Sequence, residues 1–96
     1  DQPITFWGYV SGTTLSPSND DGWRVSNPST GKYTLTHNQA NANYAVTVTA
    51  LRGSGAGAYS AKVESVASNN FKVTIFDDAG AVQNSDFMFI ACFSPT

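Results

Sequence analysis

The sequence predicts an all-β protein, an antiparallel β-sandwich or jelly roll of seven to eight strands. Leu and Glu, which favour helices, occur only three times and once, whereas Thr, Val and aromatic residues are frequent. Apolar and polar residues alternate repeatedly, and no window sustains the 3.6-residue period of an amphipathic helix. Short alternating segments with turn residues between them are typical of sandwiches and jelly rolls.

Three strands are expected in the first half of the chain, at residues 4–10, 23–26 and 33–36, where inward apolar residues alternate with outward ones. Residues 11–21 are expected to form a loop, because they combine Gly and Pro with an Asn-Asp-Asp-Gly run that continues to residue 22. The Asn-Pro-Ser-Thr-Gly segment at 27–31 predicts a turn.

Four further strands are expected in the second half, at residues 44–51, 59–67, 71–75 and 87–93. A polar loop at 37–43 precedes them, and a Gly-rich tip at 52–58 separates the first two. Lys62 and Glu64 mark the 59–67 segment as a possible edge strand, since charges keep an open edge soluble. An eighth strand would form if residues 81–83 pair with a neighbour.

The last expected strand is apolar on both faces, unlike the interior strands. Phe87, Phe89, Ala91 and Phe93 share one face, and Met88, Ile90 and Cys92 share the other. A single sandwich core needs only one of these faces, so the other one requires a second partner. We expect the phenylalanine face to fill the core, although the two faces could be exchanged.

The first strand has the same property, because it carries Trp7 and Tyr9 opposite its own apolar face. Pairing of the two terminal strands would therefore give a sheet with an apolar outer surface, and exposed surfaces of this kind mark interaction sites. Another copy of the chain, around a threefold or twofold axis, is the simplest partner. The expected interface residues are Trp7, Tyr9, Met88, Ile90 and Cys92.

Length and composition limit the classes of protein that fit. Ninety-six residues suit one domain, 1–96, expected to be a fragment or terminal domain of a longer protein because it starts at Asp1 without a signal peptide. One cysteine allows no internal disulfide, so oligomerisation is one remaining way to stabilise so small a domain. The sequence contains no basic run that would predict a nucleic-acid partner, and it contains no apolar run long enough to span a membrane.

No residue pattern predicts an enzyme. His37 lacks a recognisable nucleophile and is expected to be a solvated loop residue, and Cys92 is expected to be a small buried hydrophobe without activating neighbours. The Asp clusters fit turns better than a metal site, and Glu64 as the sole Glu argues against a glycosidase. We therefore predict a non-enzymatic protein with no cofactor and no metal.

Ligand-binding residues are expected in the loops, because scaffolds of this kind present their binding groups there. Only 12% of the residues are charged, and the many Ser, Thr and Asn side chains suit hydrogen bonding to neutral partners such as glycans. The candidate ligand-binding residues are Asp20, Asp21, Trp23, His37, Asn38, Asn41 and Arg52.

Nearly the whole chain resembles the small β domains of phage tail fibres, tailspikes and related virion proteins. The segments that carry the resemblance are ITFWGYVSGTT, GWRVSNPSTGKYTLTH, NYAVTVTA, NNFKVTIFDDAG and SDFMFIACF. The resemblance implies a trimeric knob, similar in build to complement-C1q-like and tumour-necrosis-factor-like heads, with the first and last strands together near the trimer axis. It implies receptor recognition on a bacterial surface or trimer folding at a fibre end, and it supplies no catalytic set.

The leading hypothesis is thus a homotrimeric, non-enzymatic fibre or spike domain of a virion, which binds a host surface glycan or caps the trimer. A monomeric carbohydrate-binding or adhesive module of a secreted bacterial protein is the first alternative, and it would use Trp7 and Tyr9 to stack on sugars. A capsid decoration protein is a further alternative, and a hydrolase is the last. The expected location is the virion, or otherwise the extracellular space.

Overall fold

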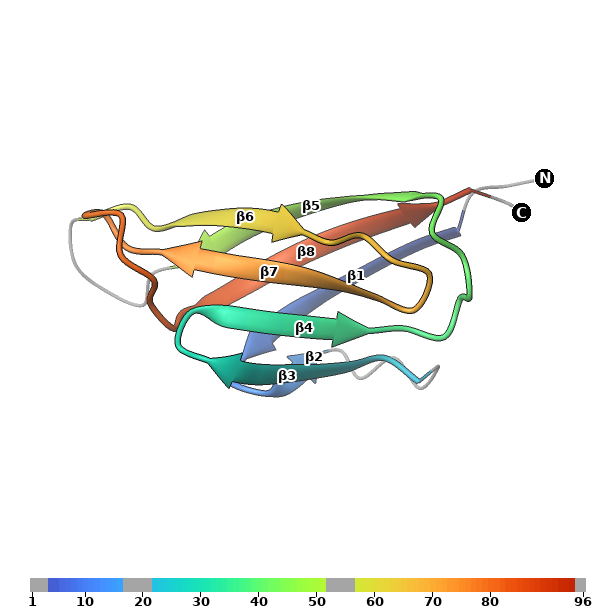
Figure 1. Ribbon diagram of the computed structural model, residues 1–96, viewed down its shortest axis with the longest axis horizontal. Helices are drawn as coiled ribbons and strands as arrows, with labels where there is room; N and C mark the ends of the chain where they lie inside the picture. Colours follow the sequence, from blue (N-terminus) through green and yellow to red (C-terminus); the bar gives the residue numbers. More distant parts are fainter. Residues whose placement is uncertain (1–3, 17–21, 52–56, 95–96) are drawn as a thin grey trace.

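The chain folds into two antiparallel four-stranded sheets that pack face to face (Figure 1), which confirms the predicted all-β sandwich. The computed structural model describes residues 4–16, 22–51 and 57–94. One sheet has the strand order β2-β1-β8-β5 and the other has the order β3-β4-β7-β6. The strands are β1 (Ile4–Ser11), β2 (Thr14–Ser16), β3 (Arg24–Ser29), β4 (Lys32–Thr36), β5 (Tyr44–Leu51), β6 (Ser60–Glu64), β7 (Asn70–Phe76) and β8 (Asp86–Phe93).

All seven strands expected from the sequence are present, but the eighth is not the one considered above. Val82 makes only an isolated bridge to Phe76. The eighth strand is β2, inside the segment 11–21 that was expected to be a loop. It pairs with β1 from Ser11↔Thr14 onward, through a two-residue connection in which Gly12 has a φ of 62°. Positive φ is what a tight hairpin turn of this length requires, and Gly supplies it without steric cost.

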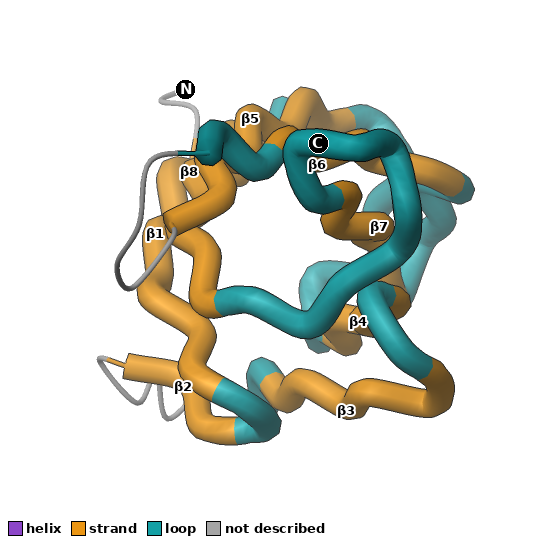
Figure 2. Tube along the Cα trace, turned by 90° about the vertical axis from the view of Figure 1, so that its left-hand side faces the viewer, coloured by secondary structure: helices purple, strands orange, loops and turns teal. Residues whose placement is uncertain are grey.

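The expected turn at 27–31 is also shorter than predicted, because β3 continues to Ser29 through Pro28. A proline is tolerated here because β3 is an edge strand and its register with β4 shifts between Ser26 and Ser29. The other edge of the same sheet is β6, which confirms the expected edge strand with Lys62 and Glu64. Viewed end on, β5 lies beside β6 and β2 beside β3, so the two sheets approach each other at both margins (Figure 2).

The two terminal strands lie side by side in the centre of their sheet. β1 and β8 are paired from Ile4↔Phe93 to Val10↔Phe87, and β5 pairs with the other side of β8. Phe87, Phe89, Ala91 and Phe93 are buried, whereas Met88 and Ile90 are exposed. The prediction that the phenylalanine face fills the core and the opposite face points outward is therefore confirmed.

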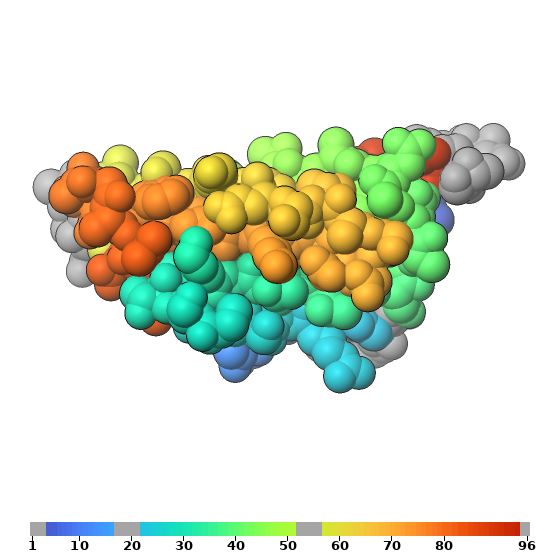
Figure 3. All heavy atoms as spheres, viewed as in Figure 1, coloured from blue at the N-terminus to red at the C-terminus, as the bar shows by residue number. Residues whose placement is uncertain are grey.

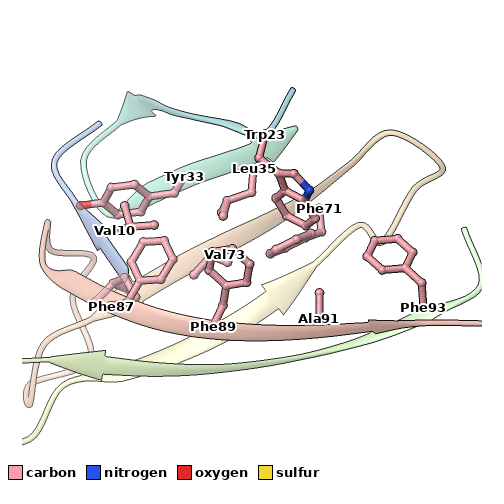
Figure 4. Packing of buried hydrophobic residues seen from close by; sticks show 11 residues of the cluster. Val10, Trp23, Tyr33, Leu35, Phe71, Val73, Phe87, Phe89, Ala91 and Phe93 are labelled. Atoms are coloured by element: carbon pink, nitrogen blue, oxygen red, sulfur yellow. The ribbon is translucent and has the colours of Figure 1, made fainter. Parts of the chain in front are cut away.

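Aromatic rings from both sheets fill the core (Figure 4). The Trp23 indole stacks on Phe89 with ring centroids 5.6 Å apart and also contacts Phe6 at 5.1 Å. Gly8 makes room for this stack, since a Cβ atom at that position would lie 2.7 Å from the Phe89 ring. The aromatic-Gly-aromatic sequence of β1 is thus explained by the ring that β8 places against it.

Candidate interaction surface

Sheet β2-β1-β8-β5 presents an unusual outer surface, here called the outer A face. Its central rows follow from the strand register, in which Ile90 lies between Trp7 and Thr47, and Met88 lies between Tyr9 and Thr49. The exposed fractions are 59% for Trp7, 54% for Ile90, 43% for Met88 and 36% for Tyr9. The outer A face is defined by Thr5, Trp7, Tyr9, Ala45, Thr47, Thr49, Met88, Ile90 and Cys92.

A shallow groove of about 260 Å³ crosses this face. Its walls are the side chains of Trp7, Tyr9, Met88, Ile90 and the threonines of β5, and Gly8 and Phe89 complete its lining. Sequence reasoning found the β1 and β8 residues but missed Thr47 and Thr49. Their outward direction followed from the alternation of β5, whereas the pairing of β5 with β8 could not be read from that alternation.

The outer A face carries almost no charge. Among the described residues that point outward from this sheet, Asp86 is the only Asp, Glu, Lys or Arg, and it lies at the margin. The Tyr9 hydroxyl donates a hydrogen bond of 2.8 Å to its carboxylate. This hydrogen bond to the Asp86 carboxylate raises the pKa of Tyr9 above its ordinary value, so Tyr9 stays protonated and neutral. Covering this face therefore requires the desolvation of very few charges.

Cys92 is exposed on the outer A face, so the expectation that it is a buried hydrophobe is wrong for the single chain. The reason is the strict alternation of β8, which places residue 92 on the side opposite Ala91 and Phe93. The Thr5 hydroxyl lies 3.8 Å from the Cys92 sulfur and donates a weak hydrogen bond to it. The thiol adds a small, polarisable group to this surface.

The loop residues predicted to bind a ligand fall into three groups. Asp20, Asp21 and Arg52 lie outside the described residues. Asn38 is exposed beside Gly22. Half-buried Asn41 donates from its side-chain amide to the Ser94 carbonyl at 3.2 Å and thus links this loop to the residue that follows β8. Trp23 and His37 come close to Asn38 in the chain fold, but both side chains are buried and present no open surface.

His37 is only 3% exposed, so its expected position as a solvated loop residue is wrong. Its imidazole lies between the rings of Trp23, Tyr44 and Phe93, with centroid distances of 5.0 to 5.3 Å. Nδ1 accepts a hydrogen bond from the Gln39 backbone at 3.2 Å, whereas Nε2 has no partner among the described residues. Burial lowers the pKa of His37 below its ordinary value of 6.5, and the nearby Ala67 carbonyl opposes this shift.

Within the described part of the chain, no group of three or more His, Cys, Asp or Glu side chains could hold a metal ion. In that same part, no helix is long and apolar enough to cross a membrane. No protein-family model, curated protein or solved structure matches the chain.

Proposed function

We propose that this chain is a non-enzymatic assembly domain that forms a homotrimer through its outer A face. In this proposal the trimer belongs to the fibre or spike of a virion, where it caps the assembly or presents a surface that recognises a host glycan. The observation that supports the proposal most directly is the exposed, nearly uncharged patch around Trp7 and Ile90.

The free energy available from covering this patch is large relative to the size of the domain. An aromatic side chain can bury ~150–250 Å² and an aliphatic one somewhat less, so the four large side chains and their threonine neighbours offer on the order of several hundred Å². At ~25 cal/mol per Å² this corresponds to roughly 10 kcal/mol before the cost of association is subtracted. A specific interface covers roughly 800 Å² per partner, of which the patch would supply about half.

The threefold arrangement rests on the resemblance to trimeric knobs and on the positions of the terminal strands. The resemblance implies that the first and last strands lie together near the trimer axis. The pairing of β1 with β8 in the middle of the sheet agrees with that arrangement, since it centres the apolar residues of both strands on one face. A closed symmetric assembly would cover the same face on every copy.

Sedimentation equilibrium of the wild type and two lysine variants tests the proposal. Ile90→Lys introduces a charge at the centre of the outer A face, and Thr34→Lys introduces the same charge on the outer surface of the other sheet. We expect the wild type and Thr34→Lys to sediment as trimers and Ile90→Lys as a folded monomer. A monomeric wild type at micromolar concentration would refute the assembly, and a dimer would refute the threefold symmetry.

The groove favours one alternative function, a glycan-binding module that works as a monomer. Exposed Trp7 and Tyr9 border the groove, and aromatic faces beside hydroxyl groups are suited to stacking on sugar rings. Trp7→Ala separates the two functions. Loss of glycan binding with no change in sedimentation would favour the module, whereas weaker association with no glycan binding in either protein would favour the assembly domain.

A further inference from the structure

The lysines and arginines of this chain gather on one surface, although the sequence contains no basic run. Four of the five, Arg24, Lys32, Lys62 and Lys72, lie in four different strands of the β3-β4-β7-β6 sheet. Each alternates with an inward residue of the core, so all four point to the outer surface of this sheet, here called the outer B face. Figure 3 views the molecule from this side, over β4, β6 and β7.

The strand register places three of these cations close together. Lys32 and Lys62 flank Thr74 from the two neighbouring strands, so their Cα atoms are roughly 10 Å apart. Lys72 is two residues from Thr74 on the central strand, which makes it a diagonal neighbour of both at ~7–8 Å. The three ammonium groups can therefore reach one extended ligand that lies across β4, β7 and β6.

Few negative charges compensate these cations. Glu64 is the only carboxylate among the described residues that point outward from this sheet. It accepts a hydrogen bond of 3.1 Å from the buried Thr74 hydroxyl and lies 3.8 Å from the Lys62 ammonium group. Asp77 and Asp78 follow the end of β7, and Asp86 belongs to the other sheet. The outer B face is thus positive even though the whole chain has a net charge of −2.

We propose that the outer B face binds an acidic polysaccharide whose carboxylates pair with Lys32, Lys62 and Lys72. Between the cations the surface offers hydroxyl groups, from Ser26, Thr34 and Thr36, which suit the hydroxyls of sugar rings. A polymer that carries a carboxylate on each sugar, or on every few sugars, matches this sparse pattern of charges.

The same surface is poorly suited to nucleic acid. Duplex DNA carries one charge per ~1.7 Å of its axis, which requires a denser array of cations than this face provides. Single strands are held by stacking of bases on aromatic rings. Half-buried Phe76, at the end of β7, is the only aromatic residue among the described outward positions of this sheet. Carboxylates on a flexible sugar chain are therefore the better match in charge and in chemistry.

This inference does not depend on the proposed trimer. The outer A and outer B faces lie on opposite sides of the sandwich, so assembly through one leaves the other free. A trimer would present three outer B faces and strengthen the binding of one long polymer by raising the effective concentration. A monomer would bind the same polymer more weakly, through the same lysines.

Binding of the full chain to immobilised polygalacturonate, with neutral dextran as the reference polymer, tests the inference. We expect binding to polygalacturonate only, weakened when the NaCl concentration is raised because salt screens exposed charges. The double variant Lys62→Gln and Lys72→Gln should bind about fivefold more weakly, since each exposed pair contributes a modest amount. The control double variant, Thr13→Asp and Asn43→Asp, changes the net charge equally at exposed positions outside this face.

The outcomes separate this inference from the proposed assembly. Equal loss of binding in both double variants, equal binding to dextran, or no binding would overturn the inference. Tighter binding to single-stranded DNA than to polygalacturonate would overturn the choice of partner. Ile90→Lys, which tests the assembly, should keep lysine-dependent binding in its monomeric form, so a failure of the trimer leaves this result unchanged.

Discussion

At the scale of single residues, His37 carries the clearest energetic consequence. Its imidazole is enclosed by three aromatic rings, and its Nε2 atom has no partner among the described residues. A positive charge in this site would lose its hydration without gaining a counter-ion. Tyr44, which packs against it, stays neutral because burial raises its pKa, with the Ala67 carbonyl acting in the opposite direction. The folded state therefore favours the neutral imidazole.

The preference for a neutral His37 in the folded state predicts a loss of stability in mild acid. The folded-state pKa of His37 lies below its ordinary value of 6.5, so between these two values the unfolded chain binds more protons than the folded one. The contribution of neutral His37 to the free energy of unfolding is therefore fully present above pH 6.5, and it is lost as the pH drops towards the folded-state pKa. The change in the free energy of unfolding between pH 7.5 and pH 5, from urea titrations, measures this loss.

His37→Gln supplies the control, because the amide does not titrate and His37 is the only histidine. The variant remains informative even if it is less stable at every pH. The quantity compared is the difference in the free energy of unfolding between the two pH values. We expect that difference to be clearly smaller than in the wild type. An identical pH dependence in the two proteins would show that His37 does not cause it.

At the scale of elements, β8 explains why much of the fold could be predicted. Its two faces are both apolar, yet only the one with Phe87, Phe89 and Phe93 is large and aromatic enough to fill the space between the sheets. The alternation of β5 and β7 predicts their inward faces in the same way, because each strand repeats its pattern over at least seven residues. Long alternating strands thus carry their own orientation in the sequence.

The features that could not be predicted depend on contacts between distant segments. β2 has three residues, too few to show a period, and it exists because β1 offers it an edge for pairing. His37 is buried by rings from β5, β8 and the segment before β3, and no local pattern of the sequence indicates that these three meet around it. The outer B face combines cations from four strands, so no local window of the sequence contains the cluster.

Truncation of two neighbouring residues on β8 should change the free energy of unfolding by very different amounts. Phe89→Ala removes a buried ring that stacks on Trp23, and we expect it to lower the free energy of unfolding by about 3–5 kcal/mol. Ile90→Ala truncates an exposed side chain and should change it by at most about 0.5 kcal/mol in the protomer. Urea titration at concentrations where sedimentation shows only monomers makes the comparison. Equal losses in the two variants would contradict the assigned orientation of β8.

At the scale of the whole molecule, the two outer surfaces of the sandwich differ in chemistry. The outer A face is apolar with one carboxylate at its margin, whereas the outer B face carries four cations and one carboxylate among its described residues. Burial of the first face costs little desolvation, while burial of the second would require the removal of water from several charges. This difference supports the proposal that self-association uses the outer A face, and it leaves the outer B face to solvent or to an ionic ligand.

The proposed self-association through the outer A face would make thermal stability depend on protein concentration. Because an oligomer dissociates as it unfolds, mass action raises Tm when the concentration is raised. We expect the wild-type Tm to increase measurably over about a hundredfold range of concentration, in scans that are shown to be reversible.

Ile90→Lys should have a Tm that is independent of concentration, since its added charge would have to be buried at the interface. Thr34→Lys, which carries the same charge on the outer B face, should retain the wild-type dependence. A wild-type Tm that stays constant over that range would show that the apolar face is not covered by another copy of the chain.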